Sequence, residues 1–555
     1  MSIYPAILKT KYLAAKALGM YKIDVYDEDI NNYTEEFLKK YKGLLRKTEK
    51  APDQDAPVVL FYSVLQLSYS MHIEAIVGRI FERLGFRVVI LTSYYVKLLS
   101  DCIFRQIYGF CDILYIQDFL EYYPSKEAQE VITSLNKATC FDEIKHLRYR
   151  HTSVGLHALA SFDGKLPTDG LQGCEEVMKK ISDLLRQSCR YVDAMDKVLN
   201  LLKPVKVISV EKGDVTNCEI FYESIYRGID YIQWCSCHES DAIIEKRYNT
   251  LNYRAHPFSI SDETWAEVLK DNNEHSDIVL NSFKTGYLDG DWFRYKKLAV
   301  GKKAVDRDHL INRLGLNPNK KIAIIFSHIL NDANFFYGDD LFVGGFSEWL
   351  VKTVQAASQN EEVNWLIKLH PANVYRRTYV NDTGEYGEIE AIKNTLGEVP
   401  SNIKIIPPDI DINPYSFFMI TDYGITVRGT IGAELPCFGI PVLTAGTGRY
   451  SGKGFTIDSE TAEEYLGKVA NIHTIKPLSD AQRMLALKHA YLFFKERPAK
   501  YDTAMQDVYP YPQGHPLYRD IDIIDKDIFN NQQLVNIARF IAFSKDEDYL
   551  ASRRY

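Results

Sequence analysis

Three polar stretches in the second half of the chain carry residue types that bind phosphate. In the first of them Lys368 and His370 stand two residues apart at the end of an apolar run, and Pro371 follows. Residues two apart on a strand point to the same side, so a cation and an imidazole would lie side by side. Such a pair suits a diphosphate or a nucleotide phosphate. The alternative is a solvated lysine beside a capping histidine.

The second stretch runs from Arg428 to Glu434 and has the pattern of a turn between a strand and a helix. Gly429 lets the backbone approach a ligand, and Thr430 is a natural N-cap. The N–H groups after the cap would form an anion site, and Glu434 could accept hydrogen bonds from a ribose diol. Pro436 falls in the second turn, so the helix must be short or kinked. The alternative is a plain turn with a capping threonine.

The third stretch is a glycine-rich loop between Gly446 and Phe455. It has four glycines within nine residues, together with Arg449 and Lys453. This composition predicts a flexible cationic loop that could close over a phosphate or a sugar. An ordinary surface loop is an equal alternative.

Residues that could move a proton lie in the first half of the chain. His72 follows the first strand, where the loop should face an interdomain cleft, and Glu211 follows a later strand in the same orientation. His157 lies near a glycine-containing turn. A carboxylate or an imidazole can act as general base for a hydroxyl group. Each of the three, taken alone, also has a structural explanation.

The sequence does not predict a metal site. Cys235 to His238 contains metal-binding residue types but has no second ligand pair at a useful spacing. Asp409 and Asp411 form an Asp-x-Asp pattern, but it precedes a proline-bounded turn and is interpreted as a loop. We also find no Walker-type loop and no Gly-x-Gly-x-x-Gly motif after a strand.

Alternating strands and helices must position these residues. A strand at 57–64, a helix at 71–84 and a strand at 87–93 form a βαβ unit, which predicts a parallel sheet. Further strands are expected at 111–116, 205–210 and 231–235. In the second half strands are expected at 321–328, 363–369, 403–406, 417–422 and 441–444.

This pattern predicts an α/β protein with two Rossmann-like domains, because 555 residues are too many for one core. We expect an N-terminal leader at 1–55, a first domain at 56–315, a second at 316–477 and a mostly helical tail at 478–555. Residues 238–313 are interpreted as polar and irregular, with helices near 261–273.

Composition excludes several classes of protein. The formal net charge is −8 and no long Lys/Arg run occurs, so nucleic-acid binding has no electrostatic support. No apolar run approaches the ~20 residues that span a bilayer, and residues 1–20 do not resemble a signal peptide. The nine cysteines are an odd number and are interpreted as reduced thiols, which predicts a cytoplasmic location.

The motifs together resemble the capsule and surface polysaccharide biosynthesis proteins of bacteria, which are GT-B-type glycosyltransferase-like enzymes. The similarity is best over about 320–470 and extends more loosely to 154–159 and 253–259. The residues that carry it are Lys368 to Pro371, Thr421 to Tyr423, Gly429 to Glu434, Gly439 to Val442 and Gly448 to Asp458. Two positions differ from the usual pattern. Arg428 and Gly429 replace an expected Ser or Asn near the turn, and Glu211 stands where a His-Gly pair is common.

The resemblance implies two Rossmann-like domains whose parallel sheets face a central cleft. The second domain would bind the nucleotide-sugar and the first the acceptor, without an obligatory metal or other cofactor. Carried onto this chain, the expected donor-binding residues are Lys368, His370, Arg428, Gly429, Thr430, Gly432, Glu434, Arg449 and Lys453. Glu211, His72 and His157 are the catalytic candidates.

The functional hypothesis is transfer of a sugar from a nucleotide-activated donor to a growing surface glycan. The expected partners are therefore the donor and a glycan or lipid-linked glycan acceptor, with no nucleic acid. The location would be cytoplasmic, and contact with the inner membrane or with export machinery stays open. Three alternatives also remain: a polyol-phosphate transferase that uses a CDP-glycerol-like donor, a nucleotide-sugar 2-epimerase, and a non-catalytic assembly protein that keeps the fold as a scaffold.

Overall fold

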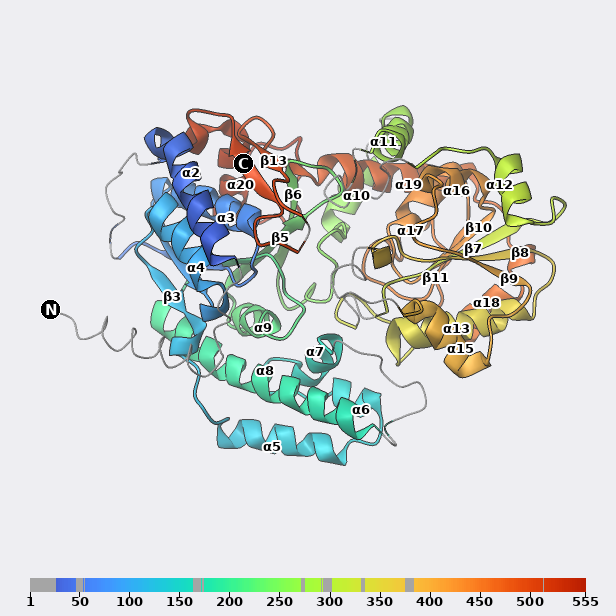
Figure 1. The fold of residues 1–555 in the computed structure, drawn as a ribbon, viewed down its shortest axis with the longest axis horizontal. Coiled ribbons are helices and arrows are strands. Elements are labelled where there is room, and N and C mark those ends of the chain that lie inside the picture. Colours follow the sequence, from blue (N-terminus) through green and yellow to red (C-terminus); the bar gives the residue numbers. More distant parts are fainter. Residues whose placement is uncertain are drawn as a thin grey trace.

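The chain forms two α/β halves, each built on its own sheet (Figure 1). This computed structural model describes residues 26–45, 53, 55–162, 171, 174–270, 275–290, 292, 302–330, 335–374, 384–512 and 514–555. Within those ranges, no helix combines the length and the apolar character that crossing a bilayer requires.

The first sheet has seven strands in the order β12-β6-β5-β4-β1-β2-β3. The five strands from β5 to β3 run parallel, whereas β6 is antiparallel to β5 and β12 is antiparallel to β6. The bounds are β1 Val58–Tyr62, β2 Arg87–Thr92, β3 Ile113–Tyr115, β4 Lys206–Ser209, β5 Asp230–Ser236, β6 Ala242–Tyr248 and β12 Ala499–Lys500.

Helices cover both faces of this sheet, which explains why β1 is apolar at every position. Val59 and Phe61 pack on the side of α3 (Ser68–Arg83). Leu60 and Tyr62 point the other way, toward α8 (Glu175–Leu202) and α9 (Cys218–Tyr226). Alternation along the strand thus supplies two separate cores.

A helical insertion lies between β3 and β4, and its helices include α5, α6, α7 and α8. Its helices besides α8 are α5 (Lys126–Ser134), α6 (Phe141–Lys145) and α7 (Val154–Ala160). Their apolar residues form one cluster with Phe335, Phe336 and Tyr337, which follow β7 in the second half of the chain. The insertion therefore ties the two halves together.

The second sheet has five parallel strands in the order β11-β10-β7-β8-β9. One face packs on α13, α15 and α18, and the other on α12 and α16. The strands are β7 Ile322–Phe326, β8 Asn364–Lys368, β9 Ile403–Ile406, β10 Tyr423–Thr426 and β11 Val442–Thr444. The helices are α12 Arg307–Leu314, α13 Gly345–Ser358, α15 Gly387–Leu396, α16 Pro414–Ile420 and α18 Ala462–Ala470. The prediction of an α/β protein with two Rossmann-like domains is confirmed.

The strand expected at 417–422 is wrong, because this segment lies largely in the helix α16. The Asn413 side chain caps the helix by accepting a hydrogen bond from the Tyr415 N–H at 3.0 Å, and Pro414 occupies the first turn. Both residues favour a helix start. The strand begins only at Tyr423, one residue beyond the predicted segment.

The region 238–313 is more regular than expected. It contains the fully buried strand β6 and two helices, α10 (Asp262–Lys270) and α11 (Ser276–Leu288). It also contains α12, whose Leu310 and Ile311 pack in one cluster with Ile322 of β7. The core of the second half therefore includes residues that precede the predicted boundary at 315.

The two ends of the described chain both pack on the first half. α2 (Asp27–Leu45), within the predicted leader, contributes Phe37 to the same core as Ile76 of α3. The tail is not purely helical. After α19 (Asp480–Tyr491) it adds β12 to the first sheet and then forms β13 (Met505–Val508), β14 (Asp520–Ile523) and α20 (Gln532–Phe543).

Candidate functional site

The loops that follow the strands of the two sheets meet each other. The Tyr337 hydroxyl, after β7, donates to Glu211 Oε1, after β4, at 3.0 Å. The Gly338 N–H donates to the Arg254 carbonyl at 2.7 Å, and the His256 N–H donates to the Gly448 carbonyl at 3.0 Å. Open α/β sheets bind ligands at the carboxyl ends of their strands. The junction therefore brings together the two edges where a ligand is expected, and we call it the interdomain junction.

Arg428 is a buried guanidinium group at this junction. It follows β10 and forms an ion pair with Asp340, and its Nε donates to the Thr447 carbonyl at 3.0 Å. Its Nη1 is enclosed but has no hydrogen-bond partner in the described part of the chain. A buried guanidinium N–H without a partner is costly, so this group is a natural contact for an anion.

Arg449 is a second guanidinium group at the same junction. Its Nη2 lies 2.8 Å from His256 Nε2, while its Nε is enclosed and unpartnered among the described residues. Burial lowers the pKa of Arg449 to about 10. Burial, followed by the charges of Arg449 and Arg428, also holds the pKa of His256 well below its usual value. The junction thus carries positive charge that an anion would stabilise.

Two histidines lie at the carboxyl ends of neighbouring strands of the second sheet. His328, after β7, has its Nε2 3.0 Å from Thr426 Oγ1, and its ring stacks on Phe346 at 4.4 Å. Burial, followed by the charge of His370, keeps the pKa of His328 well below its usual value. The His370 N–H donates to Ser327 Oγ at 3.0 Å. His328 was missed from sequence, although its place after β7 matches that of His370 after β8.

Lys368 ends β8 on the face of the second sheet that α16 covers. Its ammonium lies 5.3 Å from the centre of the Phe417 ring. Burial, followed by the charge of Lys302, lowers the pKa of Lys368 to about 8. The side chain is buried and has no acidic partner among the described residues. Its role in donor binding remains a prediction.

The turn after Arg428 differs from the predicted anion site. α17 comprises only Ile431–Glu434, followed by a 3-10 turn at Leu435–Phe438, so the expectation of a short helix is confirmed. Thr430 does not cap the helix with its side chain, because its backbone is already helical. The Gly432 N–H donates to the Gly429 carbonyl at 3.0 Å, so this donor is already used.

Glu434 is fully buried beside a tyrosine. Its Oε2 accepts a hydrogen bond from the Tyr287 hydroxyl at 2.9 Å. Burial raises the pKa of Glu434 to about 7. A ribose would have to replace the tyrosine or share the carboxylate with it. The predicted contact between Glu434 and a ribose remains untested.

Gly432 is required by packing. A Cβ at this position would collide with the Tyr450 ring, whose hydroxyl donates to the Gly429 carbonyl at 2.7 Å. We expect Gly432→Ala to lower the free energy of unfolding by about 1–3 kcal/mol, the usual range for overpacking. Urea denaturation measures this change. Gly467→Ala in α18 is the control, because a Cβ there meets open space and a helical alanine stabilises. Equal effects of the two substitutions would contradict the packing argument.

The loop from Gly446 to Phe455 is fastened to the first half of the chain. Lys453 forms an ion pair with Asp262 at 2.7 Å, and Arg449 contacts His256 as described above. The flexibility of this loop and its closure over a phosphate or a sugar remain predictions. In this structure the loop contacts the first half at two points, His256 and Asp262.

Glu211 is the carboxylate at the centre of the junction. Its Oε1 accepts from the Tyr337 hydroxyl, from the Lys212 N–H at 2.7 Å and from the Gly213 N–H at 3.1 Å. Burial raises the pKa of Glu211 despite these donors. A carboxylate with a raised pKa at a ligand edge has the properties of a general base.

Lys212, next to Glu211, was missed from sequence. It is buried, and its ammonium donates to the Tyr253 carbonyl among the rings of Phe221, Tyr248 and Tyr337. Burial lowers the pKa of Lys212 to about 7, so the group can exchange a proton near neutral pH.

His157 packs against the loop that follows β4 and carries Glu211. It lies on α7, where its Nδ1 contacts the Gly213 carbonyl and its Nε2 is 3.4 Å from the Tyr222 hydroxyl. Burial lowers its pKa to about 3. The imidazole is thus neutral and enclosed. It contacts Gly213, which stands two residues after Glu211 in the chain. Its catalytic role remains a prediction, and its geometry is that of a positioning group.

The expected location of His72 is wrong. The chain enters α3 at Ser68, directly after the β1 loop, and the first turns of this helix face the core. His72 Nε2 lies 2.6 Å from the Tyr33 hydroxyl, and its Nδ1 lies 2.8 Å from the Tyr108 hydroxyl. Its neighbours include Phe37 of α2, and its pKa is lowered to about 3 by burial. His72 therefore belongs to the core between α2 and α3, apart from the interdomain junction.

The chain is similar to known proteins in its three-dimensional structure, but its sequence matches none of the families or curated proteins compared. The β-Kdo 2,4 transferase KpsC of Thermosulfurimonas dismutans is similar over 60% of this chain and 87% of its own, at 16% identity and a TM-score of 0.31. The UDP-GlcNAc 2-epimerase of Neisseria meningitidis is similar over 79% and 98%, at 12% identity and a TM-score of 0.23. The glycosyltransferase SnogD of Streptomyces nogalater is similar over 80% and 96%, at 12% identity and a TM-score of 0.22.

The two sheets and the meeting of their carboxyl edges define the class: an α/β protein of GT-B-like architecture with a cationic site between its halves.

Proposed function

We propose that this protein is a glycosyltransferase that moves a sugar from a nucleotide-activated donor to a growing bacterial surface glycan. One observation carries the proposal. Arg428 and Arg449 each keep an enclosed guanidinium N–H without a partner at the junction of the two sheets. Guanidinium groups bind phosphate oxygens through charge-assisted hydrogen bonds, and a nucleotide diphosphate would satisfy both.

In the proposed reaction the two halves have different tasks. The second half would hold the donor phosphates through Arg428 and Arg449, with His328 and His370 at the adjacent strand ends. The first half would hold the acceptor, with Glu211 accepting the proton of its hydroxyl as the new glycosidic bond forms. The nucleotide diphosphate leaves with its extra negative charge, which the guanidinium groups would stabilise. The proposal requires no obligatory metal.

Nucleotide binding is the first test. We expect one of CMP, UDP, GDP or CDP, at about 100 times its Kd, to raise the free energy of unfolding by about 2.7 kcal/mol and the Tm with it. Arg449→Ala should weaken binding of that nucleotide at least about tenfold, because a hydrogen bond to a charged group is worth about 1.5–3 kcal/mol. Thermal denaturation with a titration of each nucleotide measures both quantities.

A matched control separates local contact from overall charge. Arg313→Ala also removes one positive charge, but Arg313 pairs with Asp411 on the surface of the second half. Its nucleotide affinity should equal that of the unchanged protein. If no nucleotide stabilises the protein, or if Arg313→Ala weakens binding as much as Arg449→Ala, the proposal fails.

Product analysis then separates the alternatives. With a donor labelled in the sugar and in the phosphate, a glycosyltransferase places only the sugar label in the glycan. Labelled phosphate in the glycan would identify a polyol-phosphate transferase, and isomerised free donor would identify a 2-epimerase. A protein that binds nucleotide but forms none of these products would be an assembly protein.

A further inference from the structure

A pocket of about 620 Å³ lies between α5 and α8 of the helical insertion. Figure 1 shows α5 along the outer margin of the first half, away from the second sheet. The pocket is open to solvent along one side, so it offers a shallow surface on which a chain of sugar rings could lie. The lining residues are Tyr123, Pro124, Ser125, Lys126, Gln129, Glu130, Thr133, Ser134, Lys137 and Arg186.

The charge of the pocket is opposite to that of the protein. Three cations line it, namely Lys126, Lys137 and Arg186, against the single acid Glu130. None of the four has an ion-pair partner in the described part of the chain. The whole chain carries a formal net charge of −8. Cations spread along a concave surface of an acidic protein, without ion-pair partners among the described residues, favour an extended anionic ligand.

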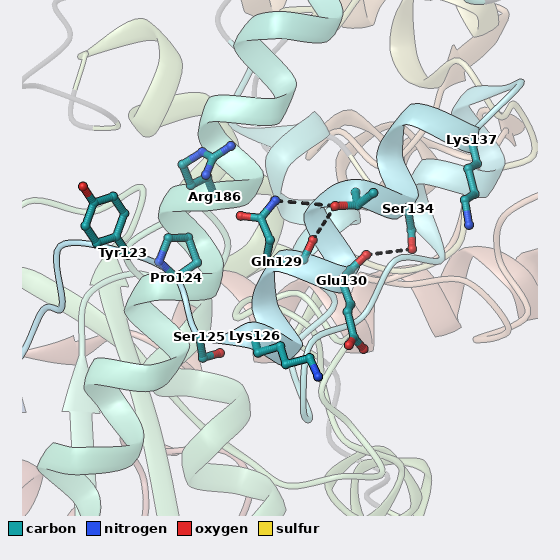
Figure 2. Close-up of a pocket in the computed structure, with 10 residues that line it drawn as sticks. Tyr123, Pro124, Ser125, Lys126, Gln129, Glu130, Ser134, Lys137 and Arg186 are labelled. Atoms are coloured by element: carbon teal, nitrogen blue, oxygen red, sulfur yellow. Dashed lines mark hydrogen bonds between the residues drawn. The ribbon is translucent and has the colours of Figure 1, made fainter.

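The pocket also has an aromatic edge and polar side chains. Tyr122 and Tyr123 are each 75% exposed, and their rings meet edge to face at 4.7 Å. Exposed tyrosine rings offer an apolar face and a polar tip, which suits the faces and hydroxyl groups of a pyranose. Figure 2 shows Arg186 of α8 above Gln129 of α5, with Tyr123 at one end and Lys137 at the other. The Gln129 amide lies 3.5 Å from the Thr133 hydroxyl, a long contact that a ligand hydroxyl could replace.

We propose that this pocket binds an acidic oligosaccharide, a segment of the growing glycan that the protein extends. Carboxylates of the sugar would pair with Arg186, Lys126 and Lys137, while a pyranose face packs on Tyr123. The proposal rests on the proposed function for the identity of the glycan. A nucleotide diphosphate fits less well, because the pocket is open and its cations are spread along its length (Figure 2).

The pocket is connected to the loop that carries Glu211 through packed helices. α8 packs on α7, whose His157 contacts the Gly213 carbonyl beside Glu211. Lys145 of α6 donates to the Val343 carbonyl of the second half. The pocket therefore belongs to the same packed body as the interdomain junction. A glycan held in the pocket would stay tethered to the protein between additions, which raises its effective concentration for the next transfer.

Direct binding tests the proposal without any donor. We expect tetragalacturonate to bind the full-length protein at low ionic strength in calorimetric titrations, and maltotetraose, its neutral counterpart, to bind at least about fivefold more weakly. Arg186→Ala should weaken tetragalacturonate binding up to about fivefold, the upper range for an exposed ion pair. Tyr123→Ala should weaken it about two- to tenfold, the range for an aromatic contact. Lys179→Ala is the matched control, because Lys179 is an exposed cation on the same helix that does not line the pocket.

Four results would overturn the proposal: no binding of tetragalacturonate at millimolar concentration, equal binding of maltotetraose, an equal loss in Lys179→Ala, or binding of phosphatidylglycerol vesicles through Arg186 in place of the saccharide. Nucleotide titrations on the same variants separate the two proposals. Nucleotide binding should be unchanged in Arg186→Ala and Tyr123→Ala. Loss of saccharide binding with intact nucleotide binding would therefore bear on the pocket alone.

Discussion

Replacing Asp548 by alanine is expected to lower the free energy of unfolding by about 3–5 kcal/mol, the usual cost of leaving a buried charge without its partner. The Asp548 side chain is 0% exposed, and its Oδ1 lies 3.0 Å from both Lys246 Nζ and Arg497 Nη1. Its Oδ2 accepts the Ser261 N–H at 2.7 Å. Both cations are also fully buried. The substitution would leave Arg497 in the core without its carboxylate partner, and Lys246 with the partly exposed Glu547 alone.

The pKa of Asp548 gives this prediction a pH dependence. Burial opposes its ionisation, but the Arg497 and Lys246 charges outweigh burial and hold its pKa well below its usual value. A carboxyl group with a lowered folded-state pKa stabilises the protein above its unfolded pKa of about 3.9. That stability disappears as the pH falls below 3.9 toward the folded-state pKa. The difference between the unchanged protein and Asp548→Ala should therefore be constant from pH 5 to 8 and shrink below pH 4.

The control is the neighbouring residue Glu547, which also pairs with Lys246 but is 22% exposed. Glu547→Ala should cost at most about 1 kcal/mol, since water screens a partly exposed pair. Urea denaturation at pH 7 measures both variants. Equal losses would mean that burial of the Asp548 network is not the cause.

Asp548 also bears on the interdomain junction. The tail residue Arg497, which Asp548 pairs with, donates to the Pro257 carbonyl at 2.9 Å, directly after His256. His256 in turn contacts Arg449. Asp548→Ala should therefore weaken nucleotide binding as well, although residue 548 lies far from the junction in sequence. The buried tail is thus part of what positions the candidate site.

The strands could be predicted from sequence because a parallel sheet covered on both faces requires continuous apolar runs. The same reasoning failed at 417–422, where an apolar run lies in a helix that Asn413 and Pro414 start. Periodicity alone does not separate a short buried helix from a buried strand. β6 was missed because three of its seven residues are charged, yet all seven are buried. Lys246 and Arg247 of β6 have partners in the tail, and no local pattern reveals them.

The candidate site could be predicted where its residues come just after a strand, because the sequence places the strand ends. Glu211 and His370 follow strands directly, and both lie at a carboxyl edge. His72 was placed by the same rule but stands in the second turn of a helix, where orientation depends on packing. Arg428 and Arg449 were identified as cations in glycine-rich turns. Their unpartnered N–H groups depend on contacts with residues 339–340 and 256, which sequence distance conceals.

Glu211→Gln is expected to lower kcat by about 10²–10⁴, the usual contribution of a general base. The amide cannot accept the proton of the acceptor hydroxyl, but it keeps the size of the side chain. Nucleotide binding should be unchanged, because the guanidinium groups lie in the second half of the chain. Asp214→Asn is the control, since Asp214 is an exposed carboxylate three residues along the same loop, and its kcat should stay within about twofold.

The pH profile distinguishes proton transfer by Glu211 from a structural role. Burial raises the pKa of this carboxyl, and a general base must be deprotonated, so kcat/KM should fall as the pH drops through the raised pKa. Tyr337→Phe removes a hydrogen bond to the carboxylate at 3.0 Å, which destabilises the charged form and raises the pKa further. The acidic limb of the profile should therefore move to higher pH in Tyr337→Phe. Lys212, whose pKa is about 7, stabilises the Glu211 carboxylate when charged, so the pair titrates as a unit. A profile that Tyr337→Phe leaves in place, or a Glu211→Gln variant with full turnover, would remove Glu211 as the base.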